Sequence, residues 1–124
     1  MILNLLKSKI HRATVTEADL HYIGSITIDE DLMEASKLHE YEKVHVLNIT
    51  NGNRLSTYVI KGDRGSGCIK INGAAAHHVN VNDLIIIVSY CQIDSDQVKN
   101  HDPSIVHVNS NNEILSIESN ELSL

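Results

Sequence analysis

Hydrophobic residues recur along most of the chain with the two-residue period of β-strands. The first segment predicts a strand that extends to about Val15, with a loop over residues 16–19. Alternation returns from Lys43 to Ile49 with a phase slip, which is typical of a β-bulge. Asn51-Gly52 then indicates a hairpin, because these residues tolerate the positive φ that a tight turn requires.

The strand that returns from this turn, residues 53–60, presents different side chains on its two faces. Its period of two places Arg54 and Tyr58 on one face and Thr57 on the other. The most apolar run, Leu84–Val88, predicts a central strand that is covered on both faces. Shorter strands are expected at residues 68–71, 104–108 and 113–117, the last two forming a hairpin.

One short amphipathic helix is predicted to follow Asp29, because that residue is a good N-cap and acidic residues come directly after it. Lys37 and His39 are expected in its last turn. The alanine run 74–76 is either a short helix or a place where small side chains let another group approach. The glycine-rich loop 61–67 lacks the spacing of a phosphate-binding loop, so it is interpreted as a mobile hairpin loop.

Composition agrees with a β-rich domain. The chain has 124 residues, a length typical of one domain, and 42% of them are hydrophobic although Trp and Phe are absent. Aliphatic, β-branched side chains are therefore expected to fill the core. The 10 basic and 16 acidic residues give a net charge of −6, which argues against nucleic acid or an anionic membrane as a partner.

Cysteine and histidine spacing argues against several kinds of site. Cys68 and Cys91 have no C-x-x-C spacing, so we expect reduced, buried cysteines in a cytoplasmic protein. The 8 histidines include no H-x-x-x-H or facial-triad pattern, which predicts no metal site. The first residues are too short for a signal peptide, and no run is long enough to span a bilayer.

The first predicted strand carries a basic segment, Lys7, Lys9, His11 and Arg12, before the first acidic residue of the chain. As a structural feature it indicates a solvated strand edge, where lysines oppose aggregation. As a functional feature it indicates a small anion-binding rim. By pattern alone the first interpretation is favoured, and the second stays open.

Gly24-Ser25 interrupts apolar, β-branched sequence on both sides. This is an unusual place for two small residues unless the backbone adopts a special conformation there. Glycine has no Cβ, so the Ser25 hydroxyl can approach the Gly24 carbonyl closely. That is the geometry a self-cleaving peptide bond needs. The serine lacks the G-x-S-x-G context of a hydrolase nucleophile.

Five blocks of sequence stand tens of residues apart: Lys9–Ala13, Ala18–Ser25, Asn51–Tyr58, Arg64–Ser66 and Asn72–His77. Together they closely resemble the bacterial aspartate 1-decarboxylase family, whose pyruvoyl-dependent enzymes make β-alanine for pantothenate biosynthesis. The likeness runs in register from about residue 1 to about residue 108. The chain departs from it at His78, over residues 92–102 and beyond Asn112, where a polar, frayed tail is expected from Glu118.

The resemblance implies a double-psi β-barrel with a few short helices, in a single domain of residues 1–124 that forms a homotetramer with active sites between subunits. It also implies a zymogen that cleaves itself at Gly24-Ser25 into residues 1–24 and 25–124. The Ser25 hydroxyl would attack the Gly24 carbonyl to form an ester, and β-elimination and hydrolysis would leave a pyruvoyl group at position 25. That group forms a Schiff base with L-aspartate and accepts electrons as CO₂ leaves.

The resemblance assigns roles to individual residues as well. Tyr58 is the proton donor in decarboxylation, and Thr57 places a hydroxyl against the oxyanion that develops during cleavage. Arg54 would hold a substrate carboxylate in its planar fork, with Lys9 and His11 completing a positive pocket. The other residues expected to line the pocket are Tyr22, Asn72, Gly73, Ala74 and Ala75.

The residues leave some alternatives open. Alternation directs Thr57 and Tyr58 to opposite faces, which either a site at a subunit seam or a distorted strand would reconcile. A rival function is a non-catalytic β-barrel module that binds a small acidic ligand or a partner chain. A DNA-binding barrel is a weaker rival, because the chain is acidic and lacks a basic recognition face.

Overall fold

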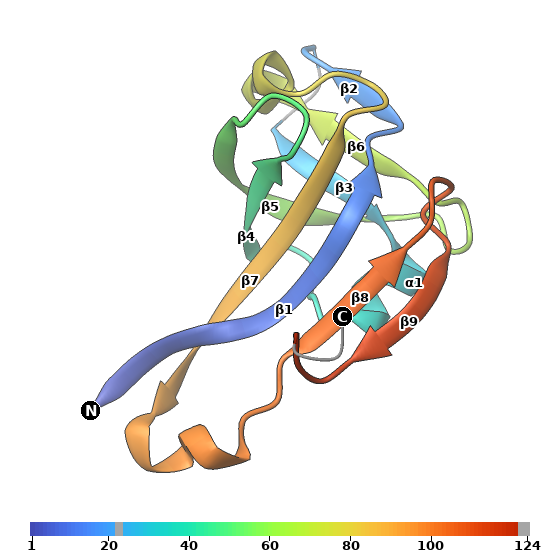
Figure 1. The fold of residues 1–124 in the computed structure, drawn as a ribbon. Helices are drawn as coiled ribbons and strands as arrows, with labels where there is room; N and C mark the ends of the chain where they lie inside the picture. The colour runs from blue at the N-terminus through green and yellow to red at the C-terminus, as the bar shows by residue number, and fades with distance from the viewer. Residues whose placement is uncertain (22–23, 122–124) are drawn as a thin grey trace.

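The computed structural model describes residues 1–21 and 24–121, which form a nine-stranded mixed sheet with short helices (Figure 1). The strands are β1 (Ile2–Thr14), β2 (Glu17–Asp19), β3 (Ser25–Asp29), β4 (Lys43–Asn48), β5 (Arg54–Gly62), β6 (Ile69–Asn72), β7 (Leu84–Asp94), β8 (Ser104–Val108) and β9 (Ile114–Glu118). The helices are α1 (Glu30–Ala35) and the 3-10 helices η1 (Gly73–His78) and η2 (Ser95–Asn100). The prediction of a mainly β fold with a few short helices is confirmed.

The strands lie in the order β2-β6-β3-β5-β4-β7-β1-β8-β9. The pairs β1–β8, β2–β6 and β3–β5 are parallel, and the other neighbours are antiparallel. Because parallel partners require crossover connections, the sheet brings together segments that are distant in sequence. β6, β3 and β5 therefore lie side by side, and β1 lies between β7 and β8. The interpretation of its basic segment as a strand edge is wrong.

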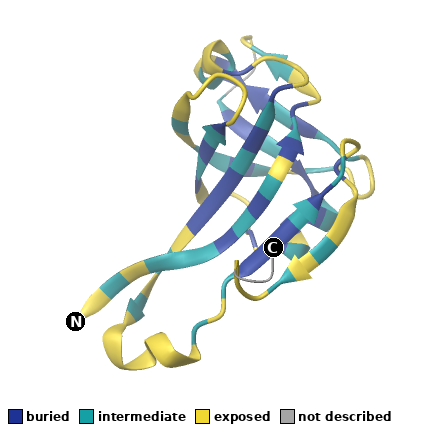
Figure 2. Cartoon of the chain, viewed as in Figure 1, coloured by how far each residue is buried: buried dark blue, intermediate teal, exposed yellow. Residues whose placement is uncertain are grey.

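Aliphatic side chains fill the core, as the composition predicts. Ile10, Ile87 and Val106 come from the three neighbouring strands β1, β7 and β8, and each is at most 1% exposed. Removing such a side chain from water contributes about 1.5–3 kcal/mol to folding. Figure 2 shows the alternation of buried and more exposed positions along these strands. The opposite face of the same strands carries both polar residues, such as Lys9, and buried aliphatic ones, such as Ile105.

Several strand boundaries differ from those predicted. Residues 17–19 form β2 rather than a loop, because they pair in parallel with the end of β6. β4 keeps one register with both of its neighbours, so the bulge predicted there is wrong. Register shifts occur instead in β1, including one between Ile10 and Ala13, where Arg12 has a φ of 64°. β7 extends to Asp94, because its second half pairs with the first half of β1.

Helix α1 begins where the sequence predicts but ends earlier. Asp29 is its N-cap, and the Asp29 side chain accepts a hydrogen bond from the Asp31 N–H at 2.8 Å. The helix ends at Ala35, so neither Lys37 nor His39 lies in its last turn. Lys37 has a φ of 59°, a conformation that cannot continue a right-handed helix.

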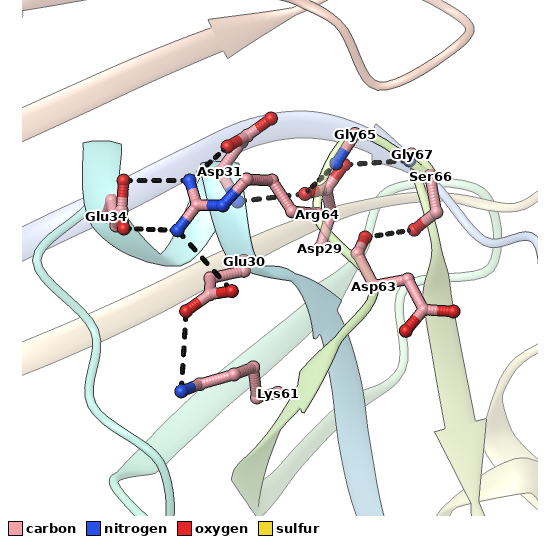
Figure 3. A network of polar contacts seen from close by, with 10 residues as sticks. All are labelled: Asp29, Glu30, Asp31, Glu34, Lys61, Asp63, Arg64, Gly65, Ser66 and Gly67. Carbon is pink, nitrogen blue, oxygen red and sulfur yellow. Dashed lines mark hydrogen bonds and ion pairs between the residues drawn. The ribbon is translucent and has the colours of Figure 1, made fainter.

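The Asp29 carboxylate also ties the loop between β5 and β6 to the start of α1 (Figure 3). It accepts hydrogen bonds from the backbone N–H groups of Gly65 (3.0 Å) and Gly67 (2.8 Å). Arg64, from the same loop, forms an ion pair with Glu34 of α1 at 2.5 Å. The loop that we expected to be mobile is held at several points, and these contacts fix the C-terminal end of β3.

Candidate active site

Ser25 begins β3 and has only 1% of its surface exposed. It is paired with Asn72, the last residue of the antiparallel strand β6. Asn72 Nδ2 donates hydrogen bonds to Ser25 Oγ at 2.9 Å and to Thr27 Oγ1 at 3.1 Å. The serine predicted to attack the chain is therefore held by another predicted site residue, which reaches it from the adjacent strand.

The other polar atom of the Asn72 side chain has no partner. Asn72 Oδ1 is buried and accepts no hydrogen bond within the described part of the chain. Leaving a buried acceptor unsatisfied costs about 1–3 kcal/mol, so such atoms call for a functional explanation. Thr27, which shares the Asn72 amide, was not predicted as a site residue. The two-residue period from Ser25 is the signal that could have found it.

The backbone at Ser25 has a φ of 143°, a conformation that residues other than glycine rarely adopt. Such strain costs about 1–3 kcal/mol and persists only where the surrounding structure imposes it. Here β3 is paired on both sides, with β5 and with β6. The strained residue directly follows the peptide bond that is predicted to break. Among the described residues, a Cβ added to Gly24 would meet no atom within 4 Å, so they do not crowd the glycine.

The parallel pairing of β3 with β5 sets the places of Thr57 and Tyr58. Ile26 is level with Val59 in this pair. The same register, continued backwards, sets Tyr58 level with Ser25, and Thr57 one position earlier. Neighbouring strands lie about 4.8 Å apart, and successive residues of a strand face opposite ways. Tyr58 is thus on the face of Ser25, whereas Thr57 shares the core-facing side of Val59, as the alternation predicts.

Arg54 and Tyr58 lie on the same face of β5, as the sequence predicts. Arg54 begins the strand and is exposed. Among the described residues, no carboxylate is within ion-pair distance of its guanidinium group. Between the two, the Ser56 hydroxyl is hydrogen-bonded with His45 Nδ1 at 3.1 Å. An uncommitted guanidinium group and a phenol on one face suit recognition of an anionic substrate.

Lys9 and His11 are placed elsewhere in the sheet. They lie on β1, which is separated from β3 by β5, β4 and β7. Lys9 Nζ forms an ion pair with Glu121 Oε1 at 2.7 Å. The His11 ring meets His107 edge-on, with the ring centroids 5.5 Å apart. Strand pairing within one chain therefore does not place Lys9 and His11 beside Ser25.

The expected positive pocket depends on Lys9 rather than on His11. Burial lowers the pKa of His11, and the nearby charges of His107 and Lys9 lower it further, although the Glu121 carboxylate acts in the opposite direction. An ordinary histidine has a pKa of about 6.5, so this shift leaves His11 mainly neutral at pH 7. His107 and Glu121 were not predicted as neighbours of the site, and no local pattern identifies them.

Lys7, the first basic residue of the segment, has a structural partner. Its Nζ lies 2.8 Å from Glu42 Oε1, and Ser89 Oγ donates a hydrogen bond to the other oxygen of that carboxylate. Burial opposes ionisation of Glu42, but the hydrogen bonds from Lys7 and Ser89 hold its pKa below the usual value. Lys7 is therefore committed to an internal ion pair that joins β1 to the start of β4.

The alanine run forms η1, so the helical alternative is the one observed. Gly73 begins it with a φ of 68° and is buried, Ala74 is exposed, and Ala75 packs against the core. These residues directly follow Asn72, so the chain leaves the Ser25 contact through a positive-φ glycine. Tyr22, also expected in the pocket, lies outside the described residues.

Other kinds of site receive no support. Within residues 1–21 and 24–121, no cluster of three or more His, Cys, Asp or Glu side chains has an arrangement that could hold a metal ion. The helices of these ranges are too short or too polar to cross a membrane. A large groove beside α1 is lined by Asp31, Glu34 and Glu113, among others. Its negative lining repels a dicarboxylate, so this groove does not suit an anionic substrate.

Comparison with known proteins identifies the class to which this fold and site belong. Residues 1–115 match the family described as Aspartate decarboxylase, so the class is a mainly β decarboxylase. The aspartate 1-decarboxylase of Acetivibrio thermocellus is 59% identical over 121 residues, which are 98% of this chain and 96% of that protein. The enzyme of the same name from Caldicellulosiruptor saccharolyticus is 58% identical over 98% of this chain and 94% of that protein. The chain belongs to the aspartate decarboxylase family.

Among solved structures, a rationally designed double-psi β-barrel protein matches with a TM-score of 0.47 and 15% sequence identity. The match covers 62% of this chain and 90% of that chain.

Proposed function

We propose that the protein converts L-aspartate to β-alanine and CO₂ in the cytoplasm, as the step that supplies β-alanine for pantothenate. Its cofactor is a pyruvoyl group made from Ser25 by cleavage of the Gly24–Ser25 bond. The observation that carries the proposal is the state of Ser25: a buried serine with a φ of 143° whose hydroxyl is held by Asn72. Strain of this kind at a reactive side chain is typical of functional sites.

Self-processing follows from the chemistry of that hydroxyl. Ser25 Oγ attacks the Gly24 carbonyl carbon, the C–N bond breaks, and an ester forms while the amine of residue 25 is freed. The Thr57 hydroxyl, one strand away, would donate to the oxyanion of this step. Loss of the Cα proton then breaks the Cβ–O bond and releases the Gly24 carboxylate. Water converts the resulting dehydroalanine to a pyruvoyl group with loss of ammonia.

The residues around position 25 fit a pyruvoyl group. Ser25 Oγ leaves with the Gly24 carboxylate, so Asn72 Nδ2, which holds that oxygen in the uncleaved chain, would then be free to donate to the ketone oxygen that water places on Cα of residue 25. The unpartnered Asn72 Oδ1 remains available as an acceptor for a substrate N–H group. The group would supply an electron sink next to the substrate amine. The phenol of Tyr58 would donate the proton that replaces CO₂ at the substrate Cα.

Substrate binding requires cations, and the two expected in this role, Arg54 and Lys9, lie on separate strands. Arg54 on β5 offers a planar fork that suits a carboxylate. Lys9 lies on β1, with β4 and β7 between the two strands. A homotetramer with sites at subunit seams would bring Lys9 of one chain to Ser25 of another. Gly73, Ala74 and Ala75 would line the site because they directly follow Asn72 in the chain.

Intact-mass measurement and a CO₂ assay test the proposed function together. The purified protein should separate into a short chain that ends at Gly24 and a long chain with a pyruvoyl-blocked residue 25, and it should release CO₂ from L-aspartate. The rival is a non-catalytic module, which would remain one uncleaved chain and release none. Cleavage without decarboxylation of L-aspartate would contradict the substrate and leave the processing standing.

Asn72→Ala is expected to slow self-cleavage about tenfold or more, because the loss of about 1.4 kcal/mol of positioning corresponds to a factor of ten in rate. The alanine removes the only described donor to Ser25 Oγ. The fraction of cleaved chain is followed over time by mass spectrometry. Asn53→Ala is the matched control, because it removes an exposed side-chain amide that donates to the His78 carbonyl of η1. Cleavage at the wild-type rate in both variants would contradict the role of Asn72.

A further inference from the structure

The C-terminal tail returns to the basic segment of β1. Glu121, three residues beyond the end of β9, places Oε1 at 2.7 Å from Lys9 Nζ. The Lys9 side chain is 20% exposed and that of Glu121 is 44% exposed, so the pair lies at the surface but is partly shielded. The expectation of a frayed tail from Glu118 is wrong for this part of the tail.

Strand register explains why the tail reaches this cation. Lys9 of β1 is level with Ile105 of β8, and Ile105 is level with Glu118 of β9. Paired residues share a face, so these three positions form a row on the face opposite the core. The chain leaves β9 at Glu118, the end of that row, and Glu121 then meets Lys9 at its other end.

The burial of Ile105 indicates that the face opposite the core is partly covered. Ile105 is fully buried, although it is not part of the main core cluster, to which its neighbours on the other face, such as Ile10 and Val106, belong. An aliphatic residue on the outer face of a sheet is buried only when something covers it. The row that runs from Lys9 to Glu118 is therefore covered at Ile105, and Glu121 of the tail reaches the same row at Lys9.

We propose that the Glu121 carboxylate, which belongs to the chain's own tail, competes with the substrate for Lys9. The tail must therefore move aside before Lys9 can bind a substrate carboxylate. The inference rests on the proposed function, because that function makes Lys9 a substrate contact. The Glu121 side chain ends in the same carboxylate that an aspartate substrate carries twice. Both ligands therefore offer the ammonium group the same charge and the same acceptor atoms.

The competition has a measurable size. An exposed ion pair of this kind is typically worth up to about 1 kcal/mol, so its removal should raise the affinity for a dicarboxylate about two- to five-fold. The probe is succinate, which has two carboxylates but no amine with which to react. Its dissociation constant is measured by calorimetry on the full-length processed protein and on Glu121→Gln. Glu121→Gln should bind succinate two- to five-fold more tightly and show a correspondingly lower KM for L-aspartate, with kcat unchanged.

A second readout shows whether the tail contact exists in solution. The Glu121 carboxylate raises the pKa of His11, so Glu121→Gln should lower the pKa of that ring in an NMR titration. Glu113→Gln is the matched control, because it removes a carboxylate of the β8–β9 turn that is hydrogen-bonded to Asn109 instead. The control should leave the succinate affinity and the pKa of His11 unchanged.

The outcomes separate the two proposals. An unchanged pKa of His11 in Glu121→Gln would overturn the tail contact itself. A lowered pKa with unchanged succinate affinity would overturn the competition. A wild-type protein that releases no CO₂ from L-aspartate would overturn the proposed function, while succinate binding would still decide whether the tail occupies an anion site.

Discussion

Replacement of Ser25 by alanine should abolish both cleavage of the chain and CO₂ release from L-aspartate. In the proposed function the Ser25 hydroxyl is the attacking atom of the processing step and residue 25 is the source of the cofactor, so no other group in the chain would restore either function. The fold should survive, because Asn72 Nδ2 keeps its hydrogen bond to Thr27 when the serine oxygen is lost. Intact-mass spectrometry should show one uncleaved chain after prolonged incubation, and the CO₂ assay should read background.

Ser66→Ala is the matched control for this change. Ser66 is exposed, and its hydroxyl donates to the Asp63 carbonyl within the loop between β5 and β6, away from Ser25. This variant should cleave and turn over as the wild type does. CO₂ release from the Ser25→Ala protein above background would refute the origin of the cofactor in residue 25, and with it the explanation of the strained backbone there.

Much of the fold can be predicted from the sequence because strand periodicity is a local signal. The alternation in residues 53–60 and the apolar run at Leu84–Val88 correspond to β5 and to the first half of β7. The signal fails where pairing is decided at long range. β2 is only three residues long and exists because it runs beside β6. The position of β1 in the middle of the sheet is likewise a property of the topology.

Some features of the candidate site can likewise be predicted from local sequence, whereas others depend on long-range pairing. Gly24-Ser25 stands out locally, since small residues interrupt an apolar segment, and the shared face of Arg54 and Tyr58 follows from the period of a strand. The contact between Ser25 and Asn72 joins residues 47 positions apart, and only the antiparallel pairing of β3 with β6 creates it. The ion pair between Lys9 and Glu121 joins residues near opposite ends of the sequence, and no local spacing predicts it.

In the proposed function the two faces of β5 would give the neighbours Thr57 and Tyr58 different tasks. Thr57 shares the side of the buried Val59, and Tyr58 shares the side of Arg54. A residue that stabilises the oxyanion of self-cleavage needs only to reach the chain's own Gly24 carbonyl. A residue that protonates a bound substrate must instead face the cations that hold it. The alternation directs Thr57 and Tyr58 to opposite faces of β5. This arrangement is consistent with two successive reactions in the proposed function, one within the chain and one on the substrate.

Tyr58→Phe should separate these two reactions. Cleavage should proceed, because the phenol is not part of the contact between Ser25 and Asn72. Turnover should fall by a factor of about 10² or more, the usual contribution of a positioned proton donor. The fall should appear in kcat rather than in KM, since the ring that remains still fills its place beside the substrate. Mass spectrometry of the processed chains and CO₂ kinetics at several aspartate concentrations give both quantities on one preparation.

Tyr41→Phe removes the same hydroxyl from a residue that is 72% exposed, and it controls for the loss of a phenol as such. It should leave processing and kcat unchanged. Normal kcat in Tyr58→Phe would remove Tyr58 from proton donation and move that role to another donor on the same face of the sheet. Failure of Tyr58→Phe to cleave would instead make Tyr58 part of the processing site, because strand register already sets it level with Ser25.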